Sequence, residues 1–510
     1  MNLPVDYQKK IQNLLGEDYE NYLNSFAHTG RQAIRVNQLK TEPAEFLRRF
    51  HDVHHHNEPS SPSEEKGSLF LTDSLFCPVP WCGTGYIYEG TDRLSLHPYY
   101  QAGLYYIQDP SAMAPAAFLP VKPGERVLDL CAAPGGKTTA LGAALQGKGV
   151  LIANDISASR CRALLKNVQL AGLPNVIITC ERPDRLAARL PEYFDKILVD
   201  APCSGEGMFR KDPAMVHSWS PEEVDRYSSL QKEILAAAAR MLKPGGCILY
   251  STCTYSPEEN EQVVETLLAD GTFTLMPLPA YAGVDQGHPE WSLSGRKELT
   301  FCRRFWNHRV QGEGQFAALI KKNIFNNIDT RACRYKEEDY KKKNGGRSKR
   351  SAQGRQKGSV PEEFAAFINH IHPLSGEDSF LLSLADGSGS DDRLTRIDER
   401  IFLLPENAPD LNHIRVISSG LHLGSCRKNR FEPGQALALA LKAEEYDQVL
   451  RIPSGDARID RYLRCETIDA EDCPGYDGWC LICVDDYPLG WGKVQKGRIK
   501  NKYPAAWRKQ

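Results

Sequence analysis

The amino-acid sequence predicts an α/β protein with a doubly wound, Rossmann-like central domain, a small N-terminal α+β domain before it and C-terminal α/β domains after it. Two observations predict this fold class. Short apolar strands and longer helical stretches alternate between about residues 105 and 320, which is typical of a mostly parallel sheet covered by helices on both faces. A glycine turn also joins the first strand of this region to a helix, as in nucleotide-binding sheets.

The order of the elements follows from the apolar patterning. A helical pattern covers residues 7–26, a short strand follows at 33–37, and β-like material returns at about 83–89. The central domain then contributes six predicted strands, at 126–130, 150–154, 175–179, 194–200, 247–251 and about 315–320. Helices are predicted between them, as at 158–170 and 221–242.

The glycine turn has the sequence CAAPGGKTT, from Cys131 to Thr139, and ends like a phosphate-binding loop. Such a loop needs a glycine five positions before its second glycine, and Cys131 stands there instead. Pro134, inside the interval, has no N–H to donate to a phosphate. We therefore expect this turn to hold a ligand without a pyrophosphate.

The next strand ends on an acidic residue that suits such a ligand. Asp155 closes the strand 150–154, about 20 residues after the turn, where a carboxylate can accept hydrogen bonds from ribose hydroxyls. S-adenosylmethionine, an adenosine compound without pyrophosphate, fits these features better than NAD does. The alternative is a tight turn and a strand-end aspartate that bind no ligand.

Composition favours a cytosolic protein. The chain has 510 residues and 15 cysteines, an odd number scattered singly, which indicates reduced thiols rather than a disulfide framework. Residues 1–30 have no signal-peptide pattern, and no apolar stretch approaches the roughly 20 residues of a membrane span. The formal net charge of −2 means that any nucleic-acid binding must rest on local basic patches.

Two segments are locally basic. Residues 341–360 carry eight Lys or Arg and no acid, so this segment is either a solvated linker or a flexible arm that contacts phosphates. Residues 491–510 are basic again and include Trp491, Tyr503 and Trp507, a mixture that suits RNA. The pair Cys480 and Cys483 has zinc-like spacing but no second pair, and its surroundings indicate a buried strand instead.

Two further cysteines follow strands of the central domain. Cys203 comes after the strand 194–200, and Cys253 comes after the strand 247–251. Ligands of open α/β sheets bind outside the carboxyl ends of the strands, so both thiols are expected at the edge that holds the glycine turn. Each alone is more often a small buried side chain. Together beside a methyl donor they suit cytosine-C5 methylation, where one thiolate adds to C6 and a second group assists elimination.

These motifs resemble those of the Sun-type RNA (cytosine-C5-)-methyltransferases. The resemblance is carried by YYIQDPSAM at 105–113, CAAPGGKTTAL at 131–141, ILVDAPCSGEG at 197–207 and LYSTCTYSPEENE at 249–261. With FRKDP after the first cysteine and the long C-terminal extension, the chain is most similar to the bacterial 16S ribosomal RNA enzymes that carry a PUA-like module.

The resemblance implies a role for each candidate residue. Cys253 is the expected nucleophile, Cys203 is expected to help release the product, and Asp200 and Lys137 are expected between cofactor and target base. The residues expected to bind S-adenosylmethionine are Cys131, Ala132, Ala133, Pro134, Gly135, Gly136, Lys137, Asp155, Arg160, Asp184 and Asp200. For the acidic contact after the third strand, Glu181 and Asp184 both remain open. No metal is expected.

The expected domain division is an RNA-recognition domain at 1–95, a catalytic domain at 96–322, a basic linker at 323–360, an intermediate domain at 361–420 and a PUA-like RNA-binding domain at 421–510. We expect a cytoplasmic monomer whose partner is 16S rRNA or the small ribosomal subunit, with no membrane contact. The alternatives are a tRNA or DNA cytosine-C5 methyltransferase and a non-catalytic ribosome-assembly factor.

Overall fold

A computed structural model gives the structure of residues 3–27, 30–55, 75–324, 361–372, 393–428, 430–470 and 475–509, apart from the side chains of residues 52–55. The basic segment predicted at 341–360 lies outside the described residues. Within these ranges no helix is both long and apolar enough to cross a lipid bilayer.

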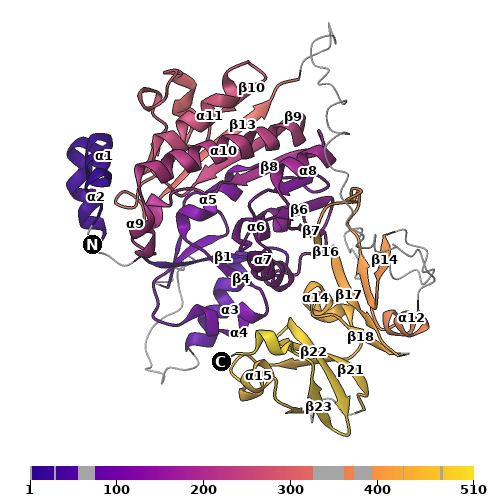
Figure 1. The fold of residues 1–510 in the computed structure, drawn as a ribbon. Coiled ribbons are helices and arrows are strands. Elements are labelled where there is room, and N and C mark those ends of the chain that lie inside the picture. Colours follow the sequence, from indigo (N-terminus) through magenta and orange to yellow (C-terminus); the bar gives the residue numbers. More distant parts are fainter. Residues whose placement is uncertain are drawn as a thin grey trace.

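A ten-stranded mixed sheet forms the centre of the molecule (Figure 1). Its strands run in the order β11-β12-β13-β9-β8-β5-β6-β7-β16, and β10 pairs with β13 beside this path. The parallel strands are β5 (Arg126–Asp129), β6 (Val150–Asn154), β7 (Val176–Thr179), β8 (Phe194–Asp200) and β9 (Leu242–Thr252). The antiparallel strands are β10 (Phe273–Met276), β11 (Val284–Gln286), β12 (Arg303–Phe305), β13 (Gln315–Lys322) and β16 (Val416–Ser419).

Helices cover both faces of this sheet, and each face has its own apolar core. One core joins the strands to α5 (Pro110–Phe118), α6 (Gly136–Ala144) and α7 (Ala158–Leu170). The other joins them to α8 (Pro183–Arg189), α10 (Pro221–Met241) and α11 (Glu261–Leu268). The starts of α7 and α10 are fixed by serine caps at Ser157 and Ser220, whose side chains accept backbone N–H bonds. The predicted doubly wound fold is confirmed.

The chain order of the parallel strands reverses direction at β5. From β5 the sheet grows through β6 and β7 on one side and through β8 and β9 on the other. A crevice for ligands forms at such a switch point, outside the carboxyl ends of the strands. The glycine turn follows β5, and the two cysteines of interest follow β8 and β9, so all three segments begin at this crevice.

The N-terminal region has two parts. Helices α1 (Val5–Leu15) and α2 (Tyr19–Ser25) pack on an aromatic cluster of the catalytic domain, which contains Phe209, Trp219, Tyr255 and Trp306. A separate sheet has the order β2-β3-β1-β4. Its strands are β2 (Phe76–Pro78), β3 (Gly85–Tyr88), β1 (Gln32–Val36) and β4 (Tyr105–Ile107), and its helices are α3 (Pro43–His55) and α4 (Pro98–Gln101).

Two smaller sheets form the C-terminal region. The first has β14 (Leu394–Ile397), β15 (Arg400–Leu403), β17 (Leu421–Cys426) and β18 (Phe431–Pro433), near α12 (Glu362–Ile368) and α14 (Gln435–Ala440). The second has β19 (Val449–Ile452), β21 (Gly478–Val484), β22 (Tyr487–Gln495), β23 (Arg498–Asn501) and β20 (Ile468–Asp469), with α15 (Ala457–Leu463). Between β15 and β17 the chain returns to the central sheet as β16, beside β7.

Residues 491–509 of the basic segment belong to or follow this last sheet. They contribute most of β22 and all of β23, and Trp491 is only 1% exposed. Cys480 and Cys483 are fully buried in β21, which confirms the interpretation of that pair as part of a strand.

The N-terminal sheet and the last C-terminal sheet share one apolar core, so these two sheets lie side by side. The Tyr99 hydroxyl donates to Asp485 at 2.7 Å, and Arg49 forms an ion pair with Asp486 at 3.1 Å. Residues more than 380 positions apart thus hold the C-terminal sheet against the N-terminal domain.

Candidate active site

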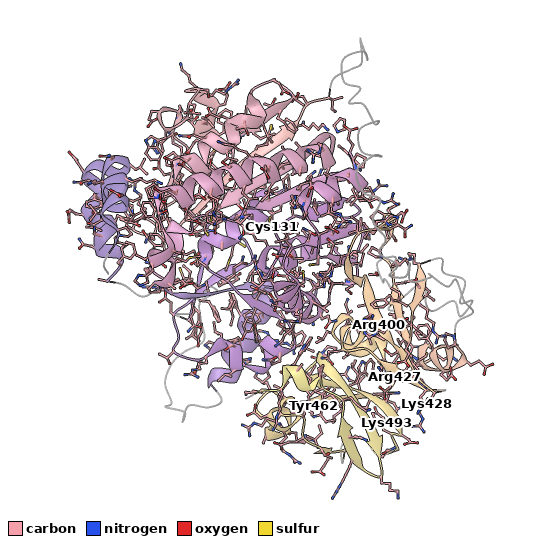
Figure 2. All side chains as sticks on the ribbon, in the orientation of Figure 1. Cys131, Arg400, Arg427, Lys428, Tyr462 and Lys493 are labelled. Carbon is pink, nitrogen blue, oxygen red and sulfur yellow. The ribbon has the colours of Figure 1, made fainter. Side chains whose placement is uncertain are left out.

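The glycine turn after β5 packs tightly against the middle of α7. Gly135 has a positive φ of 114°, and a Cβ there would lie 3.1 Å from Leu164 Cδ1, so both conformation and space require glycine. Ala132 donates its N–H to the carbonyl of Asn154 at 2.7 Å, which ties the turn to the end of β6. Cys131 lies near the middle of the catalytic domain (Figure 2), and burial raises the pKa of its thiol.

Asp155 and Arg160 join this turn directly. One carboxylate oxygen of Asp155 accepts the N–H of Ala133 at 3.3 Å, and the other accepts the N–H of Ser157 at 2.9 Å. Arg160 pairs with Asp155 at 3.3 Å and donates to the carbonyl of Ala133 at 2.5 Å. Three of the predicted cofactor residues are therefore brought together by direct contacts.

The two acidic candidates after β7 are placed differently. Glu181 is 7% exposed, donates its backbone N–H to Asn154 Oδ1 at 3.1 Å and pairs with Arg185. The side chain of Asp184 is 52% exposed and accepts from Arg182 at 3.0 Å. Of the two, only Glu181 has a hydrogen bond to Asn154, the last residue of β6, which Asp155 follows directly.

Asp200, at the end of β8, forms an ion pair with Lys137 from the glycine turn. The distance from Lys137 Nζ to the carboxylate is 2.7 Å, and the other carboxylate oxygen accepts from Ser251 Oγ at 2.7 Å. Burial acts to lower the pKa of Lys137, but the attraction of Asp200 outweighs it and the pKa is raised. Lys137 is therefore a cation at the crevice, and Cys253 lies within its electrostatic field.

The two cysteines meet across the crevice. Their sulfur atoms lie 3.3 Å apart, although the residues are 50 positions apart in sequence. The hydrogen bond to Cys253, reinforced by burial, raises the pKa of the Cys203 thiol well above its usual range. The arrangement thus holds Cys203 as a neutral thiol directly beside Cys253.

A buried carboxylate connects the segments that carry these cysteines. Glu206, three residues after Cys203 and 1% exposed, accepts the N–H of Tyr255 at 3.1 Å and the hydroxyl of Ser256 at 2.8 Å. It also accepts from Trp219 at 2.9 Å and from Lys10 of α1 at 3.1 Å. Burial alone would raise the pKa of Glu206, but Lys10 and the hydrogen bonds outweigh it, so the pKa is lowered.

Two carboxyl groups at this edge of the sheet were not assigned roles from the sequence. Asp129, at the end of β5, accepts from Thr138 with one oxygen, while its other oxygen is buried and has no partner among the described residues. Burial raises the pKa of Asp129 to about 7. Glu259 accepts from Ser204 N at 2.9 Å and Gln231 Nε2 at 2.8 Å, and burial raises its pKa to about 7 as well.

The sequence contained a signal for both carboxyl groups. Asp129 is the penultimate residue of the strand predicted at 126–130, and Glu259 lies in the quoted motif after Cys253. The orphan oxygen of Asp129 next to the glycine turn fits a ligand that donates a hydrogen bond, such as an amine or hydroxyl.

Comparison with known families gives one consistent set of matches. A model described as 16S rRNA methyltransferase RsmB/F matches residues 116–321. Three further models match the flanks: the N-terminal domain of 16S rRNA methyltransferase RsmF at 63–110, the RsmF rRNA methyltransferase first C-terminal domain at 379–441, and the methyltransferase RsmF PUA domain at 449–509.

Curated relatives carry the same description. Ribosomal RNA small subunit methyltransferase F of Serratia proteamaculans (strain 568) is 31% identical over 497 residues, which cover 93% of this chain and 89% of that protein. The protein of the same name from Aliivibrio salmonicida (strain LFI1238) is 40% identical over 302 residues, 58% of each chain.

Solved structures share the fold of the catalytic region. A methyltransferase homolog protein from Pyrococcus horikoshii is 30% identical with a TM-score of 0.51, covering 60% of this chain and 91% of that one. NSun6 from Pyrococcus horikoshii, solved with the S-adenosylmethionine analogue SFG, is 21% identical with a TM-score of 0.53, covering 63% of this chain and 99% of that one.

The raised pKa of Glu259 predicts that the free energy of unfolding depends on pH through this residue. Between its ordinary pKa of 4.5 and about 7, the folded protein holds a proton that the unfolded chain has lost, so stability falls as pH rises. Glu259→Gln keeps the shape and removes the titration. Urea unfolding at several pH values should show that the free energy of unfolding of the variant increases relative to that of the wild type as pH rises across this window, by at most about 3 kcal/mol.

The comparison of variant with wild type cancels the parallel titration of Asp129. Glu192→Gln serves as the matched control, because that side chain is 56% exposed and pairs with Lys322 at the surface. The prediction is contradicted if the free energy of unfolding of Glu259→Gln minus that of the wild type stays constant with pH or falls as pH rises.

Proposed function

We propose that this chain, which belongs to the RsmB/F family of 16S rRNA methyltransferases, uses S-adenosylmethionine to methylate C5 of a cytosine in RNA, with 16S rRNA as the substrate. The observation that carries the proposal is the pair of thiols of Cys203 and Cys253, 3.3 Å apart at the carboxyl ends of β8 and β9. A methyltransferase that acts on oxygen or nitrogen has no need of two facing thiols.

The turn Cys131–Gly136 and the strand-end acids provide the cofactor site. Asp155 would accept hydrogen bonds from the ribose, as its place at the end of β6 suits. Glu181 is the better candidate for the second acidic contact, because it is buried beside Asn154 whereas Asp184 faces solvent. The unpartnered oxygen of Asp129 provides a further acceptor for the ammonium group. When bound, the cofactor supplies an electrophilic methyl group on a sulfonium.

Cys253 is the nucleophile in this mechanism. C5 of cytosine is a weak nucleophile, and addition of the Cys253 thiolate to C6 forms an S–C6 bond and pushes an electron pair toward C5. Lys137, paired with Asp200 at 2.7 Å, places a cation near Cys253 at the crevice.

Cys203 acts after C5 carries its methyl group. The proton on C5 must then leave, the electron pair re-forms the C5–C6 double bond, and the S–C6 bond to Cys253 breaks. A base must take the proton that leaves C5, and the raised pKa of Cys203 makes its thiolate a strong base for this step once it is ionised. Its position 3.3 Å from Cys253 places it beside the S–C6 bond that breaks.

The flanking regions are proposed to hold the RNA. The C-terminal sheets display basic side chains, among them Arg400, Arg427, Lys428 and Lys493 (Figure 2). Lys496, Arg498 and Lys500 are exposed on and beside β23. Since the C-terminal sheet shares its core with the N-terminal domain, the two form one continuous RNA-binding platform beside the catalytic domain. We propose that the protein works as a monomer in the cytoplasm.

The alternatives differ in the assignment of the cysteines or in turnover. A DNA-type enzyme uses the cysteine of the Pro-Cys motif, here Cys203, as nucleophile. A tRNA enzyme shares the chemistry but not the substrate. A non-catalytic assembly factor would bind RNA without needing either thiol.

The first test separates the two cysteines. Cys253→Ala should abolish methylation and any covalent RNA adduct, because no thiolate adds to C6. Cys203→Ala should form the adduct and release it slowly, because addition is intact and elimination is impaired. A denaturing gel with target RNA and cofactor should show a shifted protein band only for Cys203→Ala. The DNA-type assignment gives the reverse pattern, and methylation retained by both variants would remove the thiols from the mechanism.

The second test addresses the cofactor. Calorimetry should detect binding of S-adenosylmethionine and none of ATP, because Cys131 and Pro134 replace positions of a phosphate cradle. Asp155→Ala and Glu181→Ala should each lower the affinity for S-adenosylmethionine about ten- to a hundredfold, because each loses a hydrogen bond to a charged group. Asp184→Ala, the matched control, should change nothing. ATP binding that Lys137→Ala removes, with no response to S-adenosylmethionine, would contradict the proposal.

A further inference from the structure

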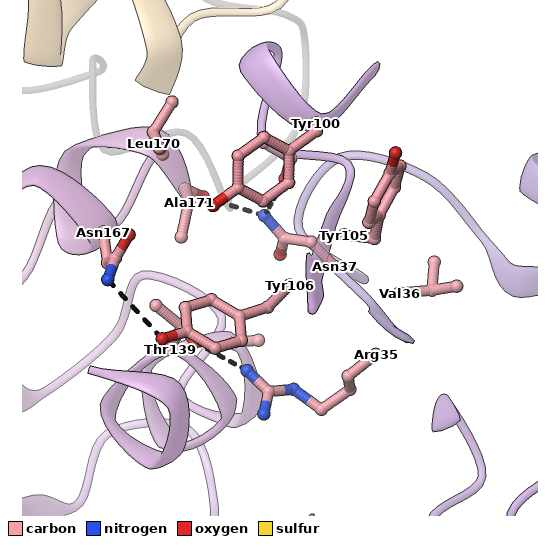
Figure 3. Close-up of a pocket in the computed structure, with 12 residues that line it drawn as sticks. Arg35, Val36, Asn37, Tyr100, Tyr105, Tyr106, Thr139, Asn167, Leu170 and Ala171 are labelled. Atoms are coloured by element: carbon pink, nitrogen blue, oxygen red, sulfur yellow. Dashed lines mark hydrogen bonds between the residues drawn. The ribbon is translucent and has the colours of Figure 1, made fainter. Parts of the chain in front are cut away.

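A small cavity lies between the N-terminal sheet and helices α6 and α7, apart from the cysteines and bordering the end of the cofactor turn at Thr139 (Figure 3). Its volume is about 30 Å³, room for about two water molecules or one compact group, and too small for a nucleobase. The lining comes from β1, the segment 100–106, α6 and α7 with the residue after it. None of the 12 lining residues is acidic.

Arg35 brings a positive charge to this cavity. The residue is 7% exposed, and its guanidinium donates to Thr139 Oγ1 at 2.6 Å and to Gln108 Oε1. The ring of Tyr106 lies 5.6 Å away. A guanidinium has five N–H donors, so the two hydrogen bonds found among the described residues leave three N–H groups for another acceptor.

Arg35 has no carboxylate partner within the part of the chain that the structure describes. Its contacts are an amide oxygen, a hydroxyl and a ring, all neutral, and burial lowers the pKa of its guanidinium. Buried charges in proteins are normally paired, because removing an ion from water is costly. A buried arginine that lines a cavity and has no paired carboxylate therefore indicates that the cavity binds an anion.

No acidic group opposes Arg35 among the described neighbours of the cavity. Lys40, behind the cavity-lining Gly103, donates to the carbonyl of Ala102 at 2.6 Å, and burial lowers the pKa of its amine to about 7. No carboxylate pairs with Lys40 among the described residues. Figure 3 shows the hydroxyls of Tyr100 and Tyr106 around the same space as Arg35. The amide of Asn167 donates to the Tyr106 hydroxyl at 3.5 Å and to the carbonyl of Pro134 at 2.8 Å, so the two hydroxyls and Arg35 are the donors that an anion would meet.

We propose that this cavity is a phosphate-binding site that takes one backbone phosphate of the substrate RNA. The assignment to RNA rests on the proposed function. A phosphate group has the size of the cavity, and two of its oxygens match the planar N–H fork of an arginine. The site holds RNA in place and takes no part in the chemistry at Cys253.

The position of the cavity suits a strand that runs along the proposed platform. Lys166, one residue before the lining Asn167 on α7, lies 5.5 Å from the ring of Trp507 in the basic C-terminal segment. The C-terminal sheet and this cavity therefore border the same helix. RNA that lies on the C-terminal sheet and enters the catalytic domain passes Asn167 and can insert a phosphate toward Arg35.

The salt dependence of RNA affinity tests this site. Each phosphate contact to single-stranded RNA contributes about 0.7 to the slope of log affinity against log salt concentration. Arg35→Gln should therefore weaken binding of the target RNA at low salt and lower that slope by about 0.7 in fluorescence anisotropy titrations. Calorimetry with S-adenosylmethionine should give the same affinity as the wild type.

Matched variants separate the phosphate contact from packing. Thr139→Val removes an anchor of Arg35 and keeps the charge, so the salt slope should stay that of the wild type. Arg182→Gln removes an exposed arginine that pairs with Asp184, and should also leave the slope unchanged. If Arg35→Gln does not fold, Ala143→Met fills the cavity while retaining Arg35, and should lower the slope by the same amount. An unchanged slope in the folded variant makes Arg35 a packing residue and overturns the proposal.

Inorganic phosphate distinguishes RNA from a free phosphate compound. Phosphate should raise the thermal unfolding midpoint of the wild type relative to chloride at equal ionic strength, and should not do so for Arg35→Gln. Bound RNA should abolish the phosphate effect on the wild type. Stabilisation by phosphate that persists with RNA bound, together with an unchanged salt slope, overturns the RNA assignment. A wild type that binds no RNA contradicts the proposed function instead.

Discussion

The buried carboxylate of Glu206 is the contact on which the geometry of the two cysteines depends. It lies three residues after Cys203 and accepts hydrogen bonds from Tyr255 and Ser256, the second and third residues after Cys253. Such a carboxylate is costly to bury unless every oxygen is used, and Lys10 of the first helix completes its shell. The N-terminal helix is therefore part of the scaffold of the site and not an appendage.

Close glycine packing complements this contact. Gly207 donates its N–H to the carbonyl of Cys253 at 2.9 Å and its own carbonyl accepts from Gly314 at the same distance. A Cβ on Gly207 would lie 2.5 Å from Gly314 Cα, closer than side chains tolerate. The segments that follow β8 and β9 and the one that precedes β13 are thus held at backbone contact distance. This packing leaves the thiols of Cys203 and Cys253 little freedom to separate.

Much of this could be predicted from the sequence, because local patterns set it. The apolar runs located the strands, the bounds of α7 were predicted to the residue, and carboxyl ends of parallel strands share one edge, which brings Cys203 and Cys253 together. What the sequence could not reveal depends on distant partners. Lys10 and Glu206 are 196 positions apart, and nothing local marks either as buried. The strands in the basic segment could not be located from the sequence, because many Lys and Arg stand there between the few buried residues Trp491, Val494 and Ile499.

The central claim is that this chain places 5-methylcytosine in 16S rRNA, and bisulfite sequencing tests it most directly. Ribosomal RNA from cells that lack the protein should lose protection from conversion at one or more 16S cytosines. A plasmid copy of the wild type should restore that protection, and a copy carrying Cys253→Ser should not. Unchanged 16S protection in the deletion strain, with protection lost instead in tRNA or DNA, would contradict the account.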